Sequence, residues 1–239
     1  MQLLDLTLDR PSANVALDEA LLEACEAGEI RGELLRLWEP EEPIVVVGRS
    51  SHVAQEVDVA YCRGHGISIL RRASGGAAIV TGPGCLMYAL VLQISRWPEL
   101  AFLDTTHRLV LRKIAEALKT LGADARIEGT SDLAIGNRKI SGNSMRRKRD
   151  WVLYHGTLLY GLSSSLIERC LRTAPRQPEY RRGRSHAEFV SRIPAGAEEL
   201  KRVLIEAWDA RAILPDWPRE LTDRFERERY LLDPWNFAR

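Results

Sequence analysis

Lys139 and His155 are the first residues of this chain whose types and spacing indicate chemistry. Lys139 lies within residues 136–142, a stretch of strand and turn character, and His155 opens a second segment, residues 155–157. A lysine in a short apolar strand is costly unless a negative group accompanies it. A ligand carboxylate or phosphate is therefore the natural partner to expect for Lys139.

A second segment strengthens this hypothesis, because Arg71 and Arg72 run directly into Ser74 and the glycine pair at residues 75–76. Glycines let the backbone approach an anion closely, their N–H groups form a concave donor surface, and arginines add charge-assisted bonds. The pattern is neither a Walker loop nor a Rossmann fingerprint. Taken alone, it is equally well explained by a glycine turn with solvated arginines.

Lys139 and His155 also have purely structural explanations. Lys139 could be a surface lysine at a hairpin, and His155 could be a hydrogen-bonded core histidine. The order of three segments along the chain favours chemistry: residues 72–76, then Asp132 with residues 138–142, then residues 155–159. The probability that all three segments occur in this order by chance is small, so together they predict one anion site.

Composition predicts a globular domain with no global preference for nucleic acid or anionic membranes. The chain has 239 residues, 45% of them apolar and 28% charged, and a formal net charge of +1. No apolar run approaches the roughly 18 residues of a membrane span. The cysteines lack metal-ligand or disulfide spacing, which predicts a soluble protein of the reducing cytoplasm. They are Cys25, Cys62, Cys85 and Cys170.

The elements that position these segments follow from hydrophobic periodicity. A hairpin over residues 132–141, turning at Gly136 and Asn137, would be followed by a strand over residues 151–160, which places Lys139 and His155 on neighbouring strands. Further strands are expected at residues 1–10, 35–38, 44–48, 66–70, 78–80 and 86–92, with helices at 57–63, 163–171, 198–209 and 218–228 and a basic loop at 175–184.

Two longer helices carry cap signals. Ser12 is expected to cap a helix that ends near Ala27, and Asp104 or Thr105 a second helix that ends at Gly122.

At these segments the chain resembles the lipoate-protein ligase family, the lipoyl-attaching branch of the biotin and lipoate ligase superfamily. Residues 71–78 resemble the lipoate-binding loop, and Lys139 and His155 have the family's spacing. The resemblance extends to a first-helix signature, a segment ending in Gly-Arg, and a terminal Tyr and Trp-Asn pattern, carried here by Asn14, Ala16, Asp18, residues 38–49, Glu56, Tyr230, Trp235 and Asn236.

The resemblance implies the fold. The expected class is α/β (α+β), a class II synthetase-like catalytic domain with mixed β-sheets flanked by helices. A single domain would span residues 1–239 with a core of about residues 29–215. We expect no large C-terminal accessory domain, so a separate accessory subunit could be required.

The resemblance also implies roles for particular residues. Lys139 would be the catalytic residue, contacting both the acyl carbonyl and the α-phosphate of an acyl-adenylate, and Asp132 would lie near the nucleotide. Thr81 and Cys85 stand where the family usually has histidine and asparagine, and Ser131 where it has asparagine. The remaining substrate-binding residues would be Arg72, Ser74, Gly75, Gly76, Ala77, Ala78, Ser141 and His155.

The implied reaction activates lipoate or octanoate with ATP and Mg²⁺, the metal arriving with ATP rather than on protein ligands. The acyl group would pass to a lysine of a lipoyl-domain acceptor, of the 2-oxoacid dehydrogenase E2 or glycine cleavage H protein type. Basic residues at 146–149 and 176–184 could steer an acidic acceptor. They could also indicate nucleic-acid binding, but the interleaved aromatic residues needed for base stacking are missing.

An octanoyl or lipoyl transferase of the same superfamily, which uses a cysteine thioester and no ATP, is the alternative. Such an enzyme needs a low-pKa cysteine beside the acyl slot. Cys170 lies in a helical pattern, Cys85 lies inside the glycine loop, and residues 125–130 contain no cysteine. Biotin ligation is disfavoured because residues 47–51 lack the Gly-Arg-Gly-Arg loop of that branch.

Overall fold

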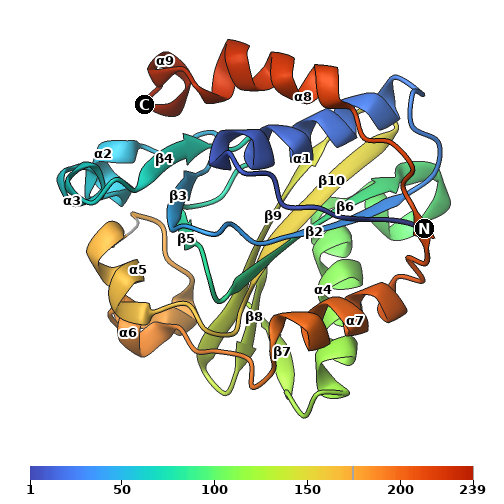
Figure 1. Ribbon diagram of the computed structural model, residues 1–239. Helices are drawn as coiled ribbons and strands as arrows, with labels where there is room; N and C mark the ends of the chain where they lie inside the picture. Colours follow the sequence, from blue (N-terminus) through green and yellow to red (C-terminus); the bar gives the residue numbers. More distant parts are fainter. Residues whose placement is uncertain (174, 239) are drawn as a thin grey trace.

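The computed structural model describes residues 1–173 and 175–238, and within them the strands form two sheets (Figure 1). The larger sheet has the strand order β11-β1-β2-β6-β10-β9-β8-β7, and the smaller has the order β4-β3-β5. Both mix parallel and antiparallel pairs. The strands are β1 Gln2–Asp5, β2 Leu34–Trp38, β3 Ile44–Val47, β4 Ser68–Arg71, β5 Ile79–Thr81, β6 Cys85–Gln93, β7 Ala125–Glu128, β8 Asp132–Ile135, β9 Arg138–Arg147, β10 Trp151–Leu159 and β11 Ala212–Ile213.

Helices cover both faces of the larger sheet (Figure 1). Helix α1 lies on one face with α8 packed against it, while α4 and α7 lie on the other. Helices α2, α3, α5 and α6 surround the smaller sheet. The helices are α1 Pro11–Glu26, α2 Val53–Glu56, α3 Val59–Gly64, α4 Leu103–Lys119, α5 Ser164–Cys170, α6 His186–Phe189, α7 Ala197–Ala207, α8 Arg219–Phe225 and α9 Asp233–Asn236, with a π-helical turn at Glu226–Tyr230.

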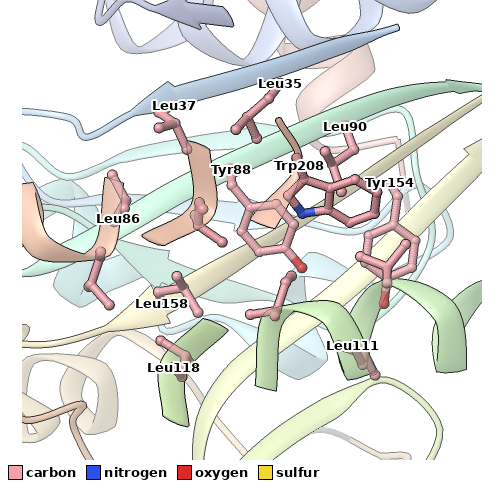
Figure 2. Packing of buried hydrophobic residues seen from close by; sticks show 14 of the residues in the cluster. Leu35, Leu37, Leu86, Tyr88, Leu90, Leu111, Leu118, Tyr154, Leu158 and Trp208 are labelled. Carbon is pink, nitrogen blue, oxygen red and sulfur yellow. The ribbon is translucent and has the colours of Figure 1, made fainter. Parts of the chain in front are cut away.

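The two-residue period of the central strands decides which side chains meet which helix. On β10, Val152 and Tyr154 pack toward α4, whereas Trp151 and Leu153 pack toward α1. Figure 2 shows the α4 side of this core, where Tyr88, Tyr154 and Trp208 lie among leucines. His155 continues the odd-numbered set of β10 and therefore faces α1.

The sequence predicted the fold class correctly: mixed sheets flanked by helices are present. The hairpin is also confirmed, because β8 and β9 pair antiparallel on either side of Gly136, whose φ of 59° suits glycine. A β-bulge interrupts the pair: Leu133 and Ala134 are consecutive, yet their partners are Ser141 and Lys139. Ile140 is thus the extra residue, directly beside Lys139.

Both helix-cap predictions are wrong. Helix α1 begins at Pro11, so Ser12 lies inside its first turn and donates a hydrogen bond to Glu226. Helix α4 begins at Leu103, and the hydroxyl of Thr105 bonds to backbone carbonyls that precede the helix. In α1 a tertiary contact takes the place of the expected side-chain cap, and in α4 contacts with the preceding turn do so. Among the described residues, no helix is long and apolar enough to cross a membrane.

Candidate functional site

Lys139 has a protein carboxylate as its negative partner. Its Nζ lies 2.8 Å from Oδ1 of Asp132 on the neighbouring strand β8, and Tyr180 donates its hydroxyl to the other carboxylate oxygen at 2.8 Å. Burial, reinforced by the nearby Asp132, raises the pKa of Tyr180 far above its ordinary value, so the phenol remains a donor. A ligand carboxylate or phosphate was the expected partner of Lys139, and the structure places a protein carboxylate there. An ammonium has three N–H donors, so two others remain for a ligand.

The path of the Lys139 side chain requires glycine at position 142. A Cβ placed on Gly142 would lie 2.7 Å from Nζ and 2.8 Å from Cε of Lys139, closer than such atoms pack. The lysine therefore folds back along its own strand, over Gly142, toward Asp132. The bulge at Ile140 lies between these two positions.

Two adjoining cavities meet at Lys139. The main cavity, of about 420 Å³, has an apolar end formed by α1 and four strands, lined by Val15, Trp38, Val46, Ile79 and Met87. The side cavity, of about 130 Å³, lies between the smaller sheet and helices α5 and α6. Its lining includes Leu159, Ile167, Phe189, Arg172, Arg181 and His186. Lys139, Gly142 and Thr157 line both, so the ammonium stands at the junction.

A buried polar chain runs along one wall of the main cavity. Ser74 lies 2.5 Å from Nε2 of His155, and Nδ1 of the same ring lies 3.1 Å from Oδ2 of Asp18. Arg36 then approaches Oδ1 of Asp18 at 2.5 Å. Burial opposes ionisation of Asp18, but Arg36 and His155 outweigh it, so the pKa of this carboxyl lies below its ordinary value. The strand period explains the arrangement, because His155 and Arg36 both face α1.

The two consecutive arginines have different roles. Arg71 is 1% exposed and donates to carbonyl oxygens of Gly48, Ser51 and Asn236, which fastens the C-terminal segment to β4. Its expected place in an anion site is wrong, because its guanidinium is engaged by the backbone. Arg72 lines the main cavity and also holds the loop, donating to Gly75 and Ala77 oxygens. Burial lowers the pKa of Arg72 to about 10, which leaves it charged at neutral pH.

The structure separates the expected site residues into two groups. Seven line the main cavity: Arg72, Gly76, Ala77, Ala78, Asp132, Lys139 and His155. Five do not contribute to its lining: Ser74, Gly75, Thr81, Cys85 and Ser141. Ser74 lies directly behind the lining, against His155. The side chains of Thr81, Cys85 and Ser141 are fully buried within the sheets, so direct contact with a ligand is not their role in this structure.

No cysteine among the described residues lines either cavity. All four are buried as free thiols. Burial raises the pKa of Cys85 to about 12, so its thiol is protonated at neutral pH. The requirement of a low-pKa cysteine beside an acyl slot is not met by this arrangement.

Sequence patterns did not indicate two residues of the site: Asn143, which lines the main cavity, and Tyr180, which lines neither cavity but bonds to Asp132. Asn143 bonds to Tyr88 and to the carbonyl of Ser131, and Tyr180 holds Asp132. Tyr180 could not have been found by local pattern, because it reaches Asp132 from a segment 48 residues away. A sequence signal for Asn143 did exist, because Asn143 directly follows residues 138–142, the segment that the sequence indicated.

The basic run at residues 146–149 does not form the expected rim beside Lys139. Arg147 lies eight residues farther along β9, roughly 25 Å at the usual rise of a strand. Lys148 pairs with Glu23 at 2.7 Å, and Arg149 pairs with Asp150 at 3.0 Å. The second basic segment is closer, because Arg176 lines both cavities and Arg181 lines the side cavity.

Solved structures with this fold include two ligases. One is a bi-partite lipoate protein ligase from Thermoplasma acidophilum, studied with its E2 lipoyl domain: TM-score 0.85, 22% identity, covering 99% of this chain and 96% of that one. Another is a lipoate-protein ligase A bound with ATP: TM-score 0.83, 22% identity, covering 99% and 98%. At this identity the likeness demonstrates a shared fold.

Sequence relatives carry two kinds of name. A putative lipoate-protein ligase A of Aeropyrum pernix is 31% identical, covering 90% of this chain and 76% of the relative. Lipoate--protein ligase 1 of Staphylococcus aureus is 26% identical, covering 96% and 70%. The octanoyltransferase LipM of Geobacillus kaustophilus is 24% identical, covering 96% and 95%. Because the model of the lipoyl protein ligase A/B catalytic domain also matches residues 10–211, this chain belongs to that family.

Proposed function

We propose that this chain is a lipoate-protein ligase, which activates lipoate with ATP to lipoyl-adenylate and transfers the lipoyl group to a lysine of a lipoyl-domain acceptor. One observation carries the proposal: Lys139 stands at the junction of two cavities, one with an apolar end and the other with Arg172, Arg181 and His186 in its lining. A mixed anhydride of a fatty acid and AMP has the same sequence of parts, an apolar chain, a charged junction and a nucleotide.

The main cavity suits the acyl chain. Val15, Trp38 and Met87 come from three different elements and close its apolar end, so a saturated chain or a dithiolane ring loses contact with water there. The side cavity suits the nucleotide, because Arg172, Arg181 and His186 add donors to its apolar lining. Ala77 and Ala78 line both cavities and would form the wall between the two, while Arg72 and Gly76 line the main cavity alone.

Lys139 would act by stabilising charge at both steps. When the carboxylate attacks the α-phosphate, negative charge grows on the phosphoryl oxygens, and when the acceptor amine attacks the anhydride, it grows on the acyl oxygen. Asp132 keeps the ammonium in place between these events, with Tyr180 holding the carboxylate. A donor fixed in advance costs no reorganisation in the transition state.

The substrates would be ATP and lipoate or octanoate. The related ligase bound with ATP supports the nucleotide. We assign Mg²⁺ to the ATP phosphates as part of the substrate.

A lipoyl domain is the acceptor that we propose, and the Thermoplasma ligase studied with its E2 lipoyl domain supports this choice. The basic segment at residues 176–184 flanks the cavities and suits an acidic acceptor surface. Because that relative is bi-partite, the transfer step is to be measured both with the chain alone and with an added accessory subunit.

The decisive experiment incubates the chain with ATP, magnesium and lipoate, without acceptor, and analyses the protein by native mass spectrometry. We expect a tightly bound lipoyl-adenylate and release of pyrophosphate. Octanoate in place of lipoate measures the acyl preference of the same site. If neither the adenylate nor pyrophosphate forms, the proposal of ATP-dependent activation is wrong.

An octanoyl or lipoyl transferase is the second candidate, because the chain aligns with almost the full length of the octanoyltransferase relative. The thiol chemistry of the site disfavours it: Cys85 is buried with a raised pKa, and no described cysteine reaches a cavity. Incubation with an octanoylated carrier protein distinguishes the two functions, because a transferase forms an acyl-cysteine without ATP.

A further inference from the structure

Ser74, His155 and Asp18 are arranged in the order found in serine acyltransferases and hydrolases. Nε2 of the imidazole faces the serine hydroxyl at 2.5 Å, and Nδ1 faces the carboxylate at 3.1 Å. The three residues come from the glycine loop, β10 and α1, which lie far apart in the sequence. The adenylation chemistry described above uses neither of these two contacts.

The donors and acceptors among Ser74, His155 and Asp18 follow from the buried Arg36, which lies against Asp18. Arg36 lies 2.5 Å from Asp18 and is 0% exposed, so the carboxylate is held ionised and accepts the Nδ1–H of His155. Nε2 of a neutral imidazole then carries the lone pair and accepts the O–H of Ser74. This polarity is the one required for His155 to remove the serine proton.

Arg72 supplies the positive charge that an alkoxide would need. Its Nε donates to the hydroxyl oxygen of Ser74 at 3.1 Å, and its guanidinium is charged at neutral pH. In the resting state this bond competes for a lone pair of Ser74. Once the proton has moved to His155, the same bond stabilises the oxygen anion.

Ser74 lies just behind the lining of the main cavity. Arg72, Gly76 and His155 all contribute to that lining, whereas Ser74 itself is 1% exposed. An acyl group can reach it only if the loop shifts. Such a shift has to break the bonds that hold the loop, which run to the Gly75 oxygen from Arg72 and Ser144 and to the Gly76 oxygen from Ser51. Gly75 itself has open space around the position of a Cβ.

We propose that Ser74 is a nucleophile that accepts an acyl group from an activated donor and forms an acyl-serine. The proposal rests on the proposed function only in that the acyl chain occupies the main cavity. Oγ forms a bond to the acyl carbonyl carbon as its proton moves to Nε2 of His155. The bond from that carbon to the phosphate, thiolate or phenolate leaving group then breaks, and His155 returns the proton to the leaving group or to water.

The test uses the full chain and p-nitrophenyl octanoate without ATP. We expect a burst of p-nitrophenolate of one equivalent per chain and an octanoyl ester on Ser74, located by peptide mass spectrometry. The Ser74→Ala variant should lose both. Ser74→Cys should retain the adduct as a thioester, which neutral hydroxylamine removes while the ester of the unchanged chain resists it. Thermal melting confirms that each variant is folded.

Asp18→Asn tests the chemistry. Because it also leaves the buried Arg36 without its carboxylate partner, its burst is measured at a temperature where thermal melting shows the variant folded. It keeps the shape of the side chain but presents an amide to His155, so it should slow the burst on the order of 10⁴-fold through the wrong tautomer while the ester still forms at Ser74. If Asp18→Asn leaves the burst rate unchanged, the hydrogen bonds among Ser74, His155 and Asp18 only hold the loop in place.

If the protein without substitutions forms no octanoyl adduct, or forms the adduct on Lys139 or on a cysteine, the proposal is wrong. The result is separable from the proposed function. A protein that forms lipoyl-adenylate with ATP but no acyl-serine overturns only this inference, and the reverse result overturns only the ligase assignment.

Discussion

Two ion pairs of similar length have opposite surroundings in this molecule. Arg36 and Asp18 approach to 2.5 Å with side chains 0% and 6% exposed, whereas Lys139 and Asp132 approach to 2.8 Å with side chains 25% and 10% exposed. Arg36 also donates to Asn14, so most of its donors are used inside the protein. Lys139 keeps donors directed at two cavities. Burial thus distinguishes the pair that organises the fold from the pair that is able to exchange its partner.

The energetic consequences differ in the same direction. Two buried charges are costly to remove from water, so their pairing adds little net stability, but loss of one partner leaves the other uncompensated. A pair open to a cavity can replace its lost partner with solvent or ligand. The comparison therefore predicts that the Arg36 pair governs stability and the Lys139 pair governs activity.

The largest effect is expected from Arg36→Met. This change leaves Asp18 buried without its main positive partner, and we expect the free energy of unfolding to fall by about 3 to 5 kcal/mol in chemical denaturation. The double variant Arg36→Met with Asp18→Leu should recover part of the loss, since no charge remains buried. Arg126→Met, which breaks an exposed pair with Asp124, is the control and should change stability little. Equal stability of Arg36→Met and the unchanged chain would remove the distinction between the pairs.

Lys139→Ala is expected to affect catalysis rather than folding. Loss of the fixed ammonium should slow adenylate formation by about a hundredfold or more, on the order of 3 kcal/mol, while thermal unfolding remains close to that of the unchanged chain. Single-turnover assays with ATP and lipoate measure the rate. Lys119→Ala, at the exposed end of α4, is the matched control. Retained single-turnover activity in Lys139→Ala would exclude this lysine from the chemistry.

Acidification is expected to have the smallest effect on stability near neutral pH. The loss of stability grows as the pH falls. The pKa of Asp18 is lower in the folded state than its ordinary 3.8, so below pH 4 the unfolded chain binds more protons than the folded one. Stability therefore decreases as the pH falls through the folded pKa, and it is fully present above the unfolded value. Denaturation between pH 7 and pH 3 should show a shallower acid dependence for Asp18→Asn. Identical slopes would mean that Asp18 titrates alike in both states.

Sequence patterns located the hairpin and the central strands because these elements depend on local information. The strand expected over residues 151–160 and the glycine turn at Gly136 are both present in the structure. Helix starts were predicted less well. Ser12 and Thr105 have the right type for a cap, but contacts with Glu226 and with the preceding turn place them elsewhere. A cap worth about 1 kcal/mol is easily outweighed by tertiary contacts.

The sequence predicted which residues form the candidate site better than it predicted what each of them does. Order along the chain brought Arg72, Lys139 and His155 together, and all three line one cavity. The same reasoning placed Arg71 and Arg72 in one site, because it read the segment as a loop and could not show that Arg71 would be taken up by carbonyl oxygens of Gly48, Ser51 and Asn236. Nor could it show that Thr81 and Cys85 would be buried in strands rather than directed into the loop's cavity.

By itself, the sequence determined the fold class, the family and the segments that meet at Lys139, because periodicity and motif spacing are local properties of the chain. Only the tertiary structure decided the partners. Asp132 meets Lys139, Tyr180 meets Asp132, and Asp18 and Ser74 meet His155, across separations of up to 137 residues. Such pairings depend on the register of the strands and on the placement of helix α1 against the sheet. Those features are fixed by packing of the whole core, which short segments do not encode.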